Sequence, residues 1–154
     1  AALQRLAADL GGLPMITTGA SVGGVAATRC GMLAGAAAVV SFAGPVHLDT
    51  DADPEEAPVS RTNYRGAMLT ALAGNDERLL ACIAASTATR LHQCYGTGYP
   101  ADVATAELLR PLGNVVLEPV EGCNDHFVVE HTLADGSFDR LLQRVVDELG
   151  GPRP

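Results

Sequence analysis

The sequence predicts an α/β fold in a single domain of 154 residues, with a mostly parallel sheet and helices on both faces. Short apolar segments that suit buried strands alternate with longer segments that suit helices, which is typical of parallel sheets. No internal repeat or linker interrupts the alternation, and the chain is long enough for one core. The strand candidates are residues 13–18, 37–42, 90–95 and 114–119.

Helix candidates flank these strands. Residues 1–10 carry leucines at helical spacing and end at two glycines, and residues 138–149 form an amphipathic helix that also ends at glycine. The other candidates are residues 25–33, 64–73, 77–85 and 103–109. Functional groups of a parallel sheet gather at the carboxyl ends of its strands, so we expect the site in the loops after Thr18, Phe42, Tyr95 and Val120.

The charge composition excludes several function classes. The net charge is −8, and the ten basic residues are all arginines, without a basic cluster. We therefore expect no binding to nucleic acid or to an anionic membrane surface. Walker phosphate loops, Schiff-base enzymes and Tyr-Lys dehydrogenases each need a lysine that this chain lacks. The sequence contains no unbroken run of about 20 apolar residues, so we predict no membrane span.

We expect neither a metal nor a cofactor, and the cysteines show no pattern of a metal site. Their four positions are widely spaced, without a Cys-x-x-Cys pair or a Cys/His cluster that would indicate zinc: Cys30, Cys82, Cys94 and Cys123. We interpret them as reduced, buried thiols of a cytoplasmic protein.

Residues 19–23 match the pattern Gly-x-Ser-x-Gly and lie between a predicted strand and a predicted helix. Small residues are needed where a tight strand-to-helix turn crowds its neighbours and holds a serine in a strained conformation. The helix directs its amino end at Ser21, and the Val22 N–H is placed to donate to a developing oxyanion. The segment therefore predicts a nucleophile elbow with Ser21 as the nucleophile.

Two other interpretations of this segment stay open. It is similar to the Thr-Gly-x-x-x-Gly-x-Gly cofactor loop of short-chain dehydrogenases, but the last glycine would fall at Val25 and the catalytic lysine is missing. A glycine-rich turn with an incidental serine is the simpler alternative. A nucleotide-binding α/β domain is accordingly a weaker hypothesis for the whole chain.

Beyond the elbow, the chain resembles the α/β-hydrolase family. The resemblance covers most of the chain. It is most specific in residues 13–45, where a strand with two valines ends at Ala-Gly-Pro, and extends to the loop Gly-Cys-Asn-Asp-His-Phe at residues 122–127. It implies a serine hydrolase or acyltransferase, with His126 as the base after the last strand. His131 is the second choice for the base. His47 follows the second strand, and His92 lies inside the third as a packed or edge residue.

The resemblance also implies an acid that orients the base. The family usually carries it just after the strand predicted at residues 90–95, where Asp102 is the nearest carboxylate, although helix capping is its simpler role. Asp49 or Asp51 would serve if the acid follows the preceding strand. Asp125 is too close to His126 in sequence to orient it comfortably.

The family places several strands before the helix that leads to the elbow, and here that helix is residues 1–10. The chain thus resembles the carboxyl-terminal part of an α/β-hydrolase without its amino-terminal strands. A half sheet exposes an unpaired strand edge, so we expect an upstream segment or an oligomer partner to complete it. Residues 46–86 would form a small helical cap, with an acyl pocket or plain core made by Met68, Leu69, Leu72, Leu79 and Leu80.

These observations predict a serine hydrolase of esterase or thioesterase type that acts on a small-molecule acyl substrate. Ser21, His126 and Asp102 would form the triad, and the Val22 N–H would supply half of the oxyanion hole. Ester, thioester and amide substrates all stay open. The alternative is a catalytically inactive α/β-hydrolase-like module for binding or assembly.

Overall fold

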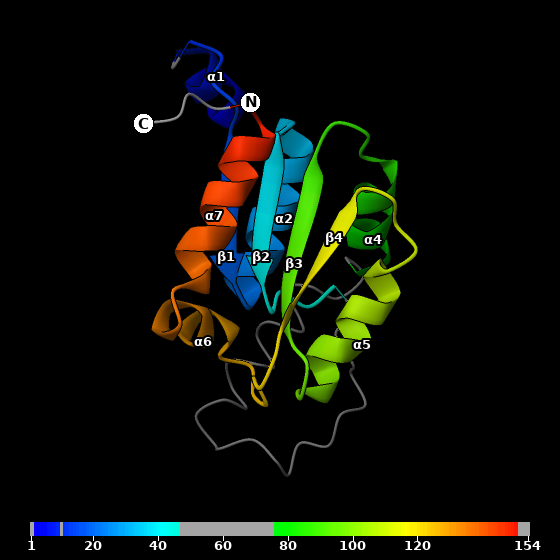
Figure 1. Cartoon of the computed structure of the whole chain (residues 1–154). Coiled ribbons are helices and arrows are strands. Elements are labelled where there is room, and N and C mark those ends of the chain that lie inside the picture. Colours follow the sequence, from blue (N-terminus) through cyan, green and yellow to red (C-terminus); the bar gives the residue numbers. More distant parts are fainter. Residues whose placement is uncertain (1, 10, 47–75, 151–154) are drawn as a thin grey trace.

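Four parallel strands form one sheet in the computed structural model, which describes residues 2–9, 11–46 and 76–150 (Figure 1). The strands lie in the order of the sequence: β1 (Ile16–Ala20), β2 (Ala38–Phe42), β3 (Arg90–Gly96) and β4 (Val115–Val120). In this register Val40 lies opposite Thr18 on β1 and His92 on β3. All four strand candidates are thus confirmed, with bounds shifted by a few residues.

Six helices are described: α1 (Ala2–Asp9), α2 (Val22–Ala34), α4 (Asp76–Ala85), α5 (Pro100–Leu109), α6 (Val128–Ala134) and α7 (Ser137–Glu148). Helix α6 was not predicted, because its seven residues are too few to give a periodic pattern. Helix α5 begins three residues earlier than predicted, since Pro100 starts its first turn. The predicted helix at residues 64–73 lies outside the described residues.

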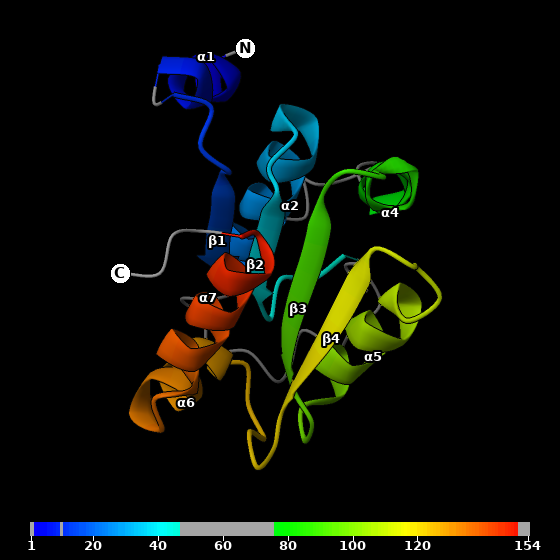
Figure 2. The same cartoon turned by 45° about the horizontal axis from the view of Figure 1, so that its top comes forward.

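Helices cover both faces of the sheet, as the fold class predicts. On one face, Val39 and Leu91 from the strands share a core with Ile83 of α4; this core also holds Val25, Met32 and Leu109. On the other face, α6 and α7 pack against the sheet, where Val40 and Phe42 meet a second core that includes Val128 and Val145. The two layers of helices are visible on opposite sides of the sheet (Figures 1 and 2).

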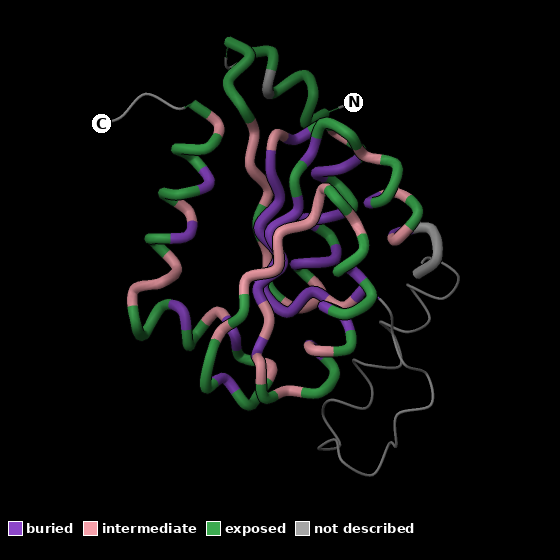
Figure 3. The backbone as a smooth tube through the Cα atoms, turned by 45° about the vertical axis from the view of Figure 1, so that its right-hand side comes forward, coloured by how far each residue is buried: buried purple, intermediate pink, exposed green. Residues whose placement is uncertain are grey.

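Burial is greatest at the centre of the sheet. Every residue of β2 is buried, whereas β1 is partly exposed along its length (Figure 3). Within the described part of the chain, β1 pairs only with β2 and is an edge strand. Helix α1 lies beyond the start of β1, away from the body of the sheet, with Leu3 and Leu6 exposed (Figure 2).

The predicted cap over residues 46–86 is described only at its two ends. Leu79 and Leu80 of α4 pack against the core beside α2 and β2. Residues 47–75 lie outside the described residues, and with them the candidates His47, Asp49, Asp51, Met68, Leu69 and Leu72. Among the helices that are described, none has the length and apolar character needed to cross a membrane.

Candidate active site

Ser21 is the single residue that joins strand β1 to helix α2. Its backbone has φ 53° and ψ −122°, a region that residues with a side chain rarely occupy. The Ser21 N–H donates to the Phe42 carbonyl on β2 at 2.8 Å, and the Ser21 carbonyl accepts from the Val25 N–H at 3.2 Å. These bonds hold the serine at the carboxyl end of β1 in the turn that the sequence predicts.

Two glycines allow this turn to close. A Cβ on Gly19 would collide with the Gly23 carbonyl in the first turn of α2. A Cβ on Gly24 would lie 2.7 Å from Ser41 Oγ and 2.9 Å from the Gly44 Cα. The start of α2 therefore packs directly against the backbone of β1 and the end of β2. A Cβ on Gly23, the second glycine of the motif, would meet nothing within 4 Å.

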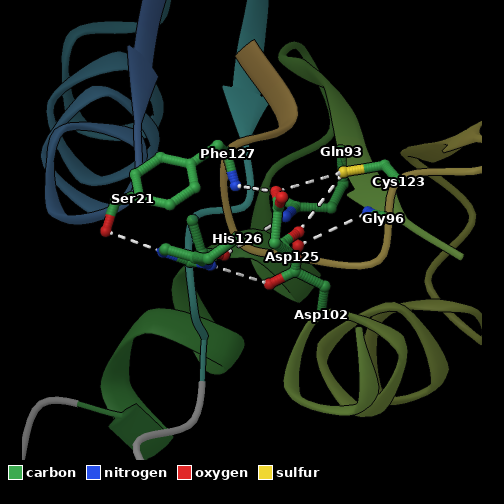
Figure 4. Close-up of polar contacts among 9 residues, drawn as sticks. Ser21, Gln93, Gly96, Asp102, Cys123, Asp125, His126 and Phe127 are labelled. Carbon is green, nitrogen blue, oxygen red and sulfur yellow. Dashed lines mark hydrogen bonds and ion pairs between the residues drawn. The ribbon is translucent and has the colours of Figure 1, made fainter. Parts of the chain in front are cut away.

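Ser21, His126 and Asp102 form one hydrogen-bonded chain (Figure 4). Ser21 Oγ lies 2.9 Å from His126 Nε2, and His126 Nδ1 lies 3.0 Å from Asp102 Oδ1. When Nδ1–H donates to the carboxylate, Nε2 is left as the acceptor for the serine hydroxyl. The arrangement can therefore remove a proton from Ser21 and keep the resulting imidazolium beside a negative charge.

Asp102 reaches the histidine from inside a helix rather than from a loop. Because α5 begins at Pro100, Asp102 is the third residue of its first turn, and its N–H donates to the Tyr99 carbonyl at 3.1 Å. The side chain does not cap the helix. Its second oxygen accepts from the Gly96 N–H at 3.3 Å, and the residue is only 4% exposed. The positive end of the helix dipole favours the carboxylate at this position.

The loop that carries His126 crosses the end of β3 at close range. A Cβ on Gly96 would lie 2.9 Å from the Cys123 carbonyl, and the Gly98 N–H donates to that same carbonyl at 3.0 Å. The Tyr99 ring packs against the His126 ring, with centroids 5.7 Å apart. The β3–α5 connection thus positions both His126 and Asp102.

The other histidines and Asp125 have different partners. His131 lies on α6, with its Nε2 3.6 Å from Asp125 Oδ2. His92 is buried in β3, and its Nδ1 lies 3.0 Å from Glu118 Oε1. The Asp125 carboxylate accepts from the Phe127 N–H at 2.8 Å, a bond that holds the pKa of Asp125 below its usual range.

Val22 follows Ser21 as the first residue of α2. N–H groups in the first turn of a helix lack intrahelical acceptors and point toward its amino end. An oxygen that forms beside Ser21 would meet this end of the helix, where the dipole favours negative charge.

Neither a protein-family model nor a curated protein sequence matches this chain. A solved structure from a study of carboxylesterases of the ammonia-oxidizing thaumarchaeon Nitrososphaera gargenis is similar, with a TM-score of 0.62 and 15% sequence identity. The similarity covers 95% of this chain and 71% of that chain. At this identity the likeness shows the fold: an α/β architecture similar to that of a carboxylesterase structure.

Proposed function

We propose that this protein is a serine hydrolase of the α/β-hydrolase type, with Ser21 as nucleophile, His126 as general base and Asp102 as the orienting acid. The observation that carries the proposal is the hydrogen-bonded chain from Ser21 Oγ to the buried Asp102 carboxylate. It begins at a strained residue in a strand-to-helix turn, the place where such a fold presents a nucleophile. The likeness in fold to a carboxylesterase structure supports the same reaction class.

In the first half of the reaction, Ser21 Oγ attacks the carbonyl carbon of the substrate. A C–O bond forms, and the hydroxyl proton moves to His126 Nε2. The carbonyl electrons move onto oxygen, where the Val22 N–H and the dipole of α2 stabilise the negative charge. The intermediate then expels its leaving group, which takes the proton from Nε2 and leaves an acyl-enzyme at Ser21.

In the second half, water takes the place of the leaving group. His126 Nε2 removes a proton from the water as it attacks the acyl carbon, and returns that proton to Ser21 Oγ when the acid departs. Throughout, Asp102 accepts from Nδ1–H and holds the imidazole in the tautomer that leaves Nε2 free to act.

We propose small carboxylic esters as the first substrates to test, because the structurally similar protein comes from a study of carboxylesterases. Thioesters and amides share the attacking step and differ in the leaving group that His126 must protonate. The bonds from Ser21 to His126 and from His126 to Asp102 favour an enzyme over the alternative of an inactive binding module.

A fluorophosphonate probe tests the proposal, because it reacts with activated serines. We expect stoichiometric labelling at Ser21 in the folded protein, together with hydrolysis of p-nitrophenyl acetate. Ser21→Ala should lose both, whereas Ser86→Ala, at the other end of the sheet, should keep both. A folded protein that takes up no label, or that is labelled equally in the Ser21→Ala variant, would contradict the proposal.

A further inference from the structure

A cluster of three metal-binding side chains lies beside the candidate active site. Cys123 and Asp125 come from the loop after β4, and His131 comes from α6. Cys123 Sγ is 3.8 Å from Asp125 Oδ1, and Asp125 Oδ2 is 3.6 Å from His131 Nε2. One ligand atom from each residue lies within 4.8 Å of the other two. In the sequence these residues fit none of the common cysteine and histidine spacings of zinc sites.

We infer that Cys123, Asp125 and His131 form a zinc-binding site. Zinc coordinated tetrahedrally by sulfur, nitrogen and oxygen sets its ligand atoms roughly 3.3–3.6 Å apart, from bond lengths of about 2.0–2.3 Å. The two separations given above lie near this spacing but involve different oxygens of the Asp125 carboxylate, and the set of three ligand atoms lies within 4.8 Å of one another. Binding therefore needs the three side chains to move inward and the Asp125 carboxylate to turn, so that one of its oxygens shares the ion with Cys123 Sγ and His131 Nε2.

The donor set selects the metal by its chemistry. Thiolate and imidazole suit zinc and similar ions, whereas calcium and magnesium prefer oxygen ligands. One thiolate and one carboxylate neutralise the charge of Zn²⁺, and a water molecule would complete the coordination. On binding, the Cys123 S–H bond breaks, an S–Zn bond forms, and the proton is released to solvent.

Access and location also fit a bound ion. The side chains of Asp125 and His131 are 52% and 42% exposed, so an ion can enter from solvent, while Cys123 lies on the buried side. His126 stands in the sequence between two of the ligands, Asp125 and His131. A bound zinc would connect the loop before His126 to the helix after it, and we therefore expect it to stabilise this segment.

Metal binding is tested on chelator-treated protein, in both the wild type and Ser21→Ala. We expect one equivalent of Zn²⁺ to bind and to raise the melting temperature, and Co²⁺ to show a thiolate-to-cobalt charge-transfer band. Because Ser21→Ala should bind zinc equally, the result does not depend on whether the protein is a hydrolase.

Four variants identify the ligands. Asp125→Asn and His131→Gln should each weaken zinc binding by about tenfold or more, and Cys123→Ser should remove the charge-transfer band. Cys30→Ser, a change at an exposed cysteine of α2, is the matched control and should change nothing. The exposed ligands Asp125 and His131 keep the test decisive if Cys123→Ser fails to fold. Unchanged affinity in both exposed variants, or a band that depends on Cys30, would overturn the inference.

Discussion

Ser21 occupies a backbone conformation that costs about 1–3 kcal/mol for a residue with a side chain. Two features of the structure enforce this conformation: the Ser21 N–H donates to the Phe42 carbonyl on β2, and helix α2 begins at the next residue. Such strain persists where surrounding contacts enforce it. The conformation of Ser21 directs its hydroxyl toward His126 Nε2, as the proposed role of Ser21 as a nucleophile requires.

The two glycines of the motif should respond differently to a methyl group. In Gly19→Ala the new Cβ would collide with the Gly23 carbonyl, so we expect a loss of about 1–3 kcal/mol of folding free energy together with a loss of Ser21 labelling. Gly23→Ala adds a Cβ in open space within helix α2, so it should be neutral or stabilising by up to about 1 kcal/mol. Urea unfolding measures the free energy of unfolding of both variants. Equal changes in the two would show that the close contact at Gly19 does not determine the stability of the turn.

Asp102 should act on the rate rather than on binding. Asp102→Asn keeps the size of the side chain but removes the charge that fixes the His126 tautomer, so kcat should fall by about three to four orders of magnitude. KM for an ester should change little, because the carboxylate is buried behind the imidazole. Asp139→Asn, on α7, is a control that should leave kcat unchanged. A loss of less than about tenfold would indicate a different acid.

At the scale of elements, charged side chains join helix α7 to the sheet. Arg144 donates to Glu118 on β4 at 2.6 Å, and Glu118 also bonds to the buried His92 on β3. Burial by itself would raise the pKa of Glu118, but the bonds from His92 and Arg144 outweigh it and hold that pKa below its usual value of 4.5. The network therefore stabilises the fold fully above pH 4.5, and this stabilisation is lost as the pH falls through the lowered pKa and Glu118 becomes protonated.

Replacing Arg144 should reveal this dependence on pH. At neutral pH, Arg144→Gln should lower the free energy of unfolding by up to about 1 kcal/mol, a modest amount because the arginine side chain is half exposed. The difference from wild type should shrink as the pH falls through the depressed pKa of Glu118, because a neutral carboxyl no longer pairs with the cation. Urea unfolding at steps from about pH 7 to 3 measures it. Arg29→Gln, with the same charge change on α2, should show no such convergence.

Local elements were mostly predictable, and the exceptions have physical reasons. Strands and long helices carry their apolar pattern in the sequence, so β1 to β4 and α7 were predicted within a few residues. Helix α6 is too short to give a periodic apolar pattern in the sequence. The hydrogen bond from the Phe127 N–H to Asp125, just before the helix, is a local detail that such a pattern does not reveal. The early start of α5 has a larger consequence. It places Asp102 inside the helix, where the carboxylate reaches His126 instead of capping the helix end.

At the scale of the whole molecule, the edge of the sheet at β1 carries a prediction. Strand β2 is buried and paired on both sides, while β1 pairs on one side within the described residues. We propose that a strand from an upstream segment or a second copy pairs with the other edge of β1, because open edges promote aggregation.

Hydrogen exchange on the intact protein tests this pairing. Amides of β1 should exchange as slowly as those of β2, because both strands would then be paired on both sides. Sedimentation at several concentrations separates the two sources, since only a second copy gives a concentration-dependent dimer. Fast exchange at every second amide of β1 would contradict the pairing.

The sequence by itself determined the order of strands and helices, the serine at the first strand-to-helix turn, and the exclusion of lysine-dependent chemistry. These features follow from neighbouring residues and from composition. Only the tertiary structure decided which side chains meet: Ser21 and His126 are 105 residues apart in sequence, and Asp102 and His126 are 24 apart. Their contact depends on the strand order and on the loop that crosses the end of β3 at Gly96. The same folding brings Cys123, Asp125 and His131 together, because separation along the chain does not specify where a loop and a helix converge.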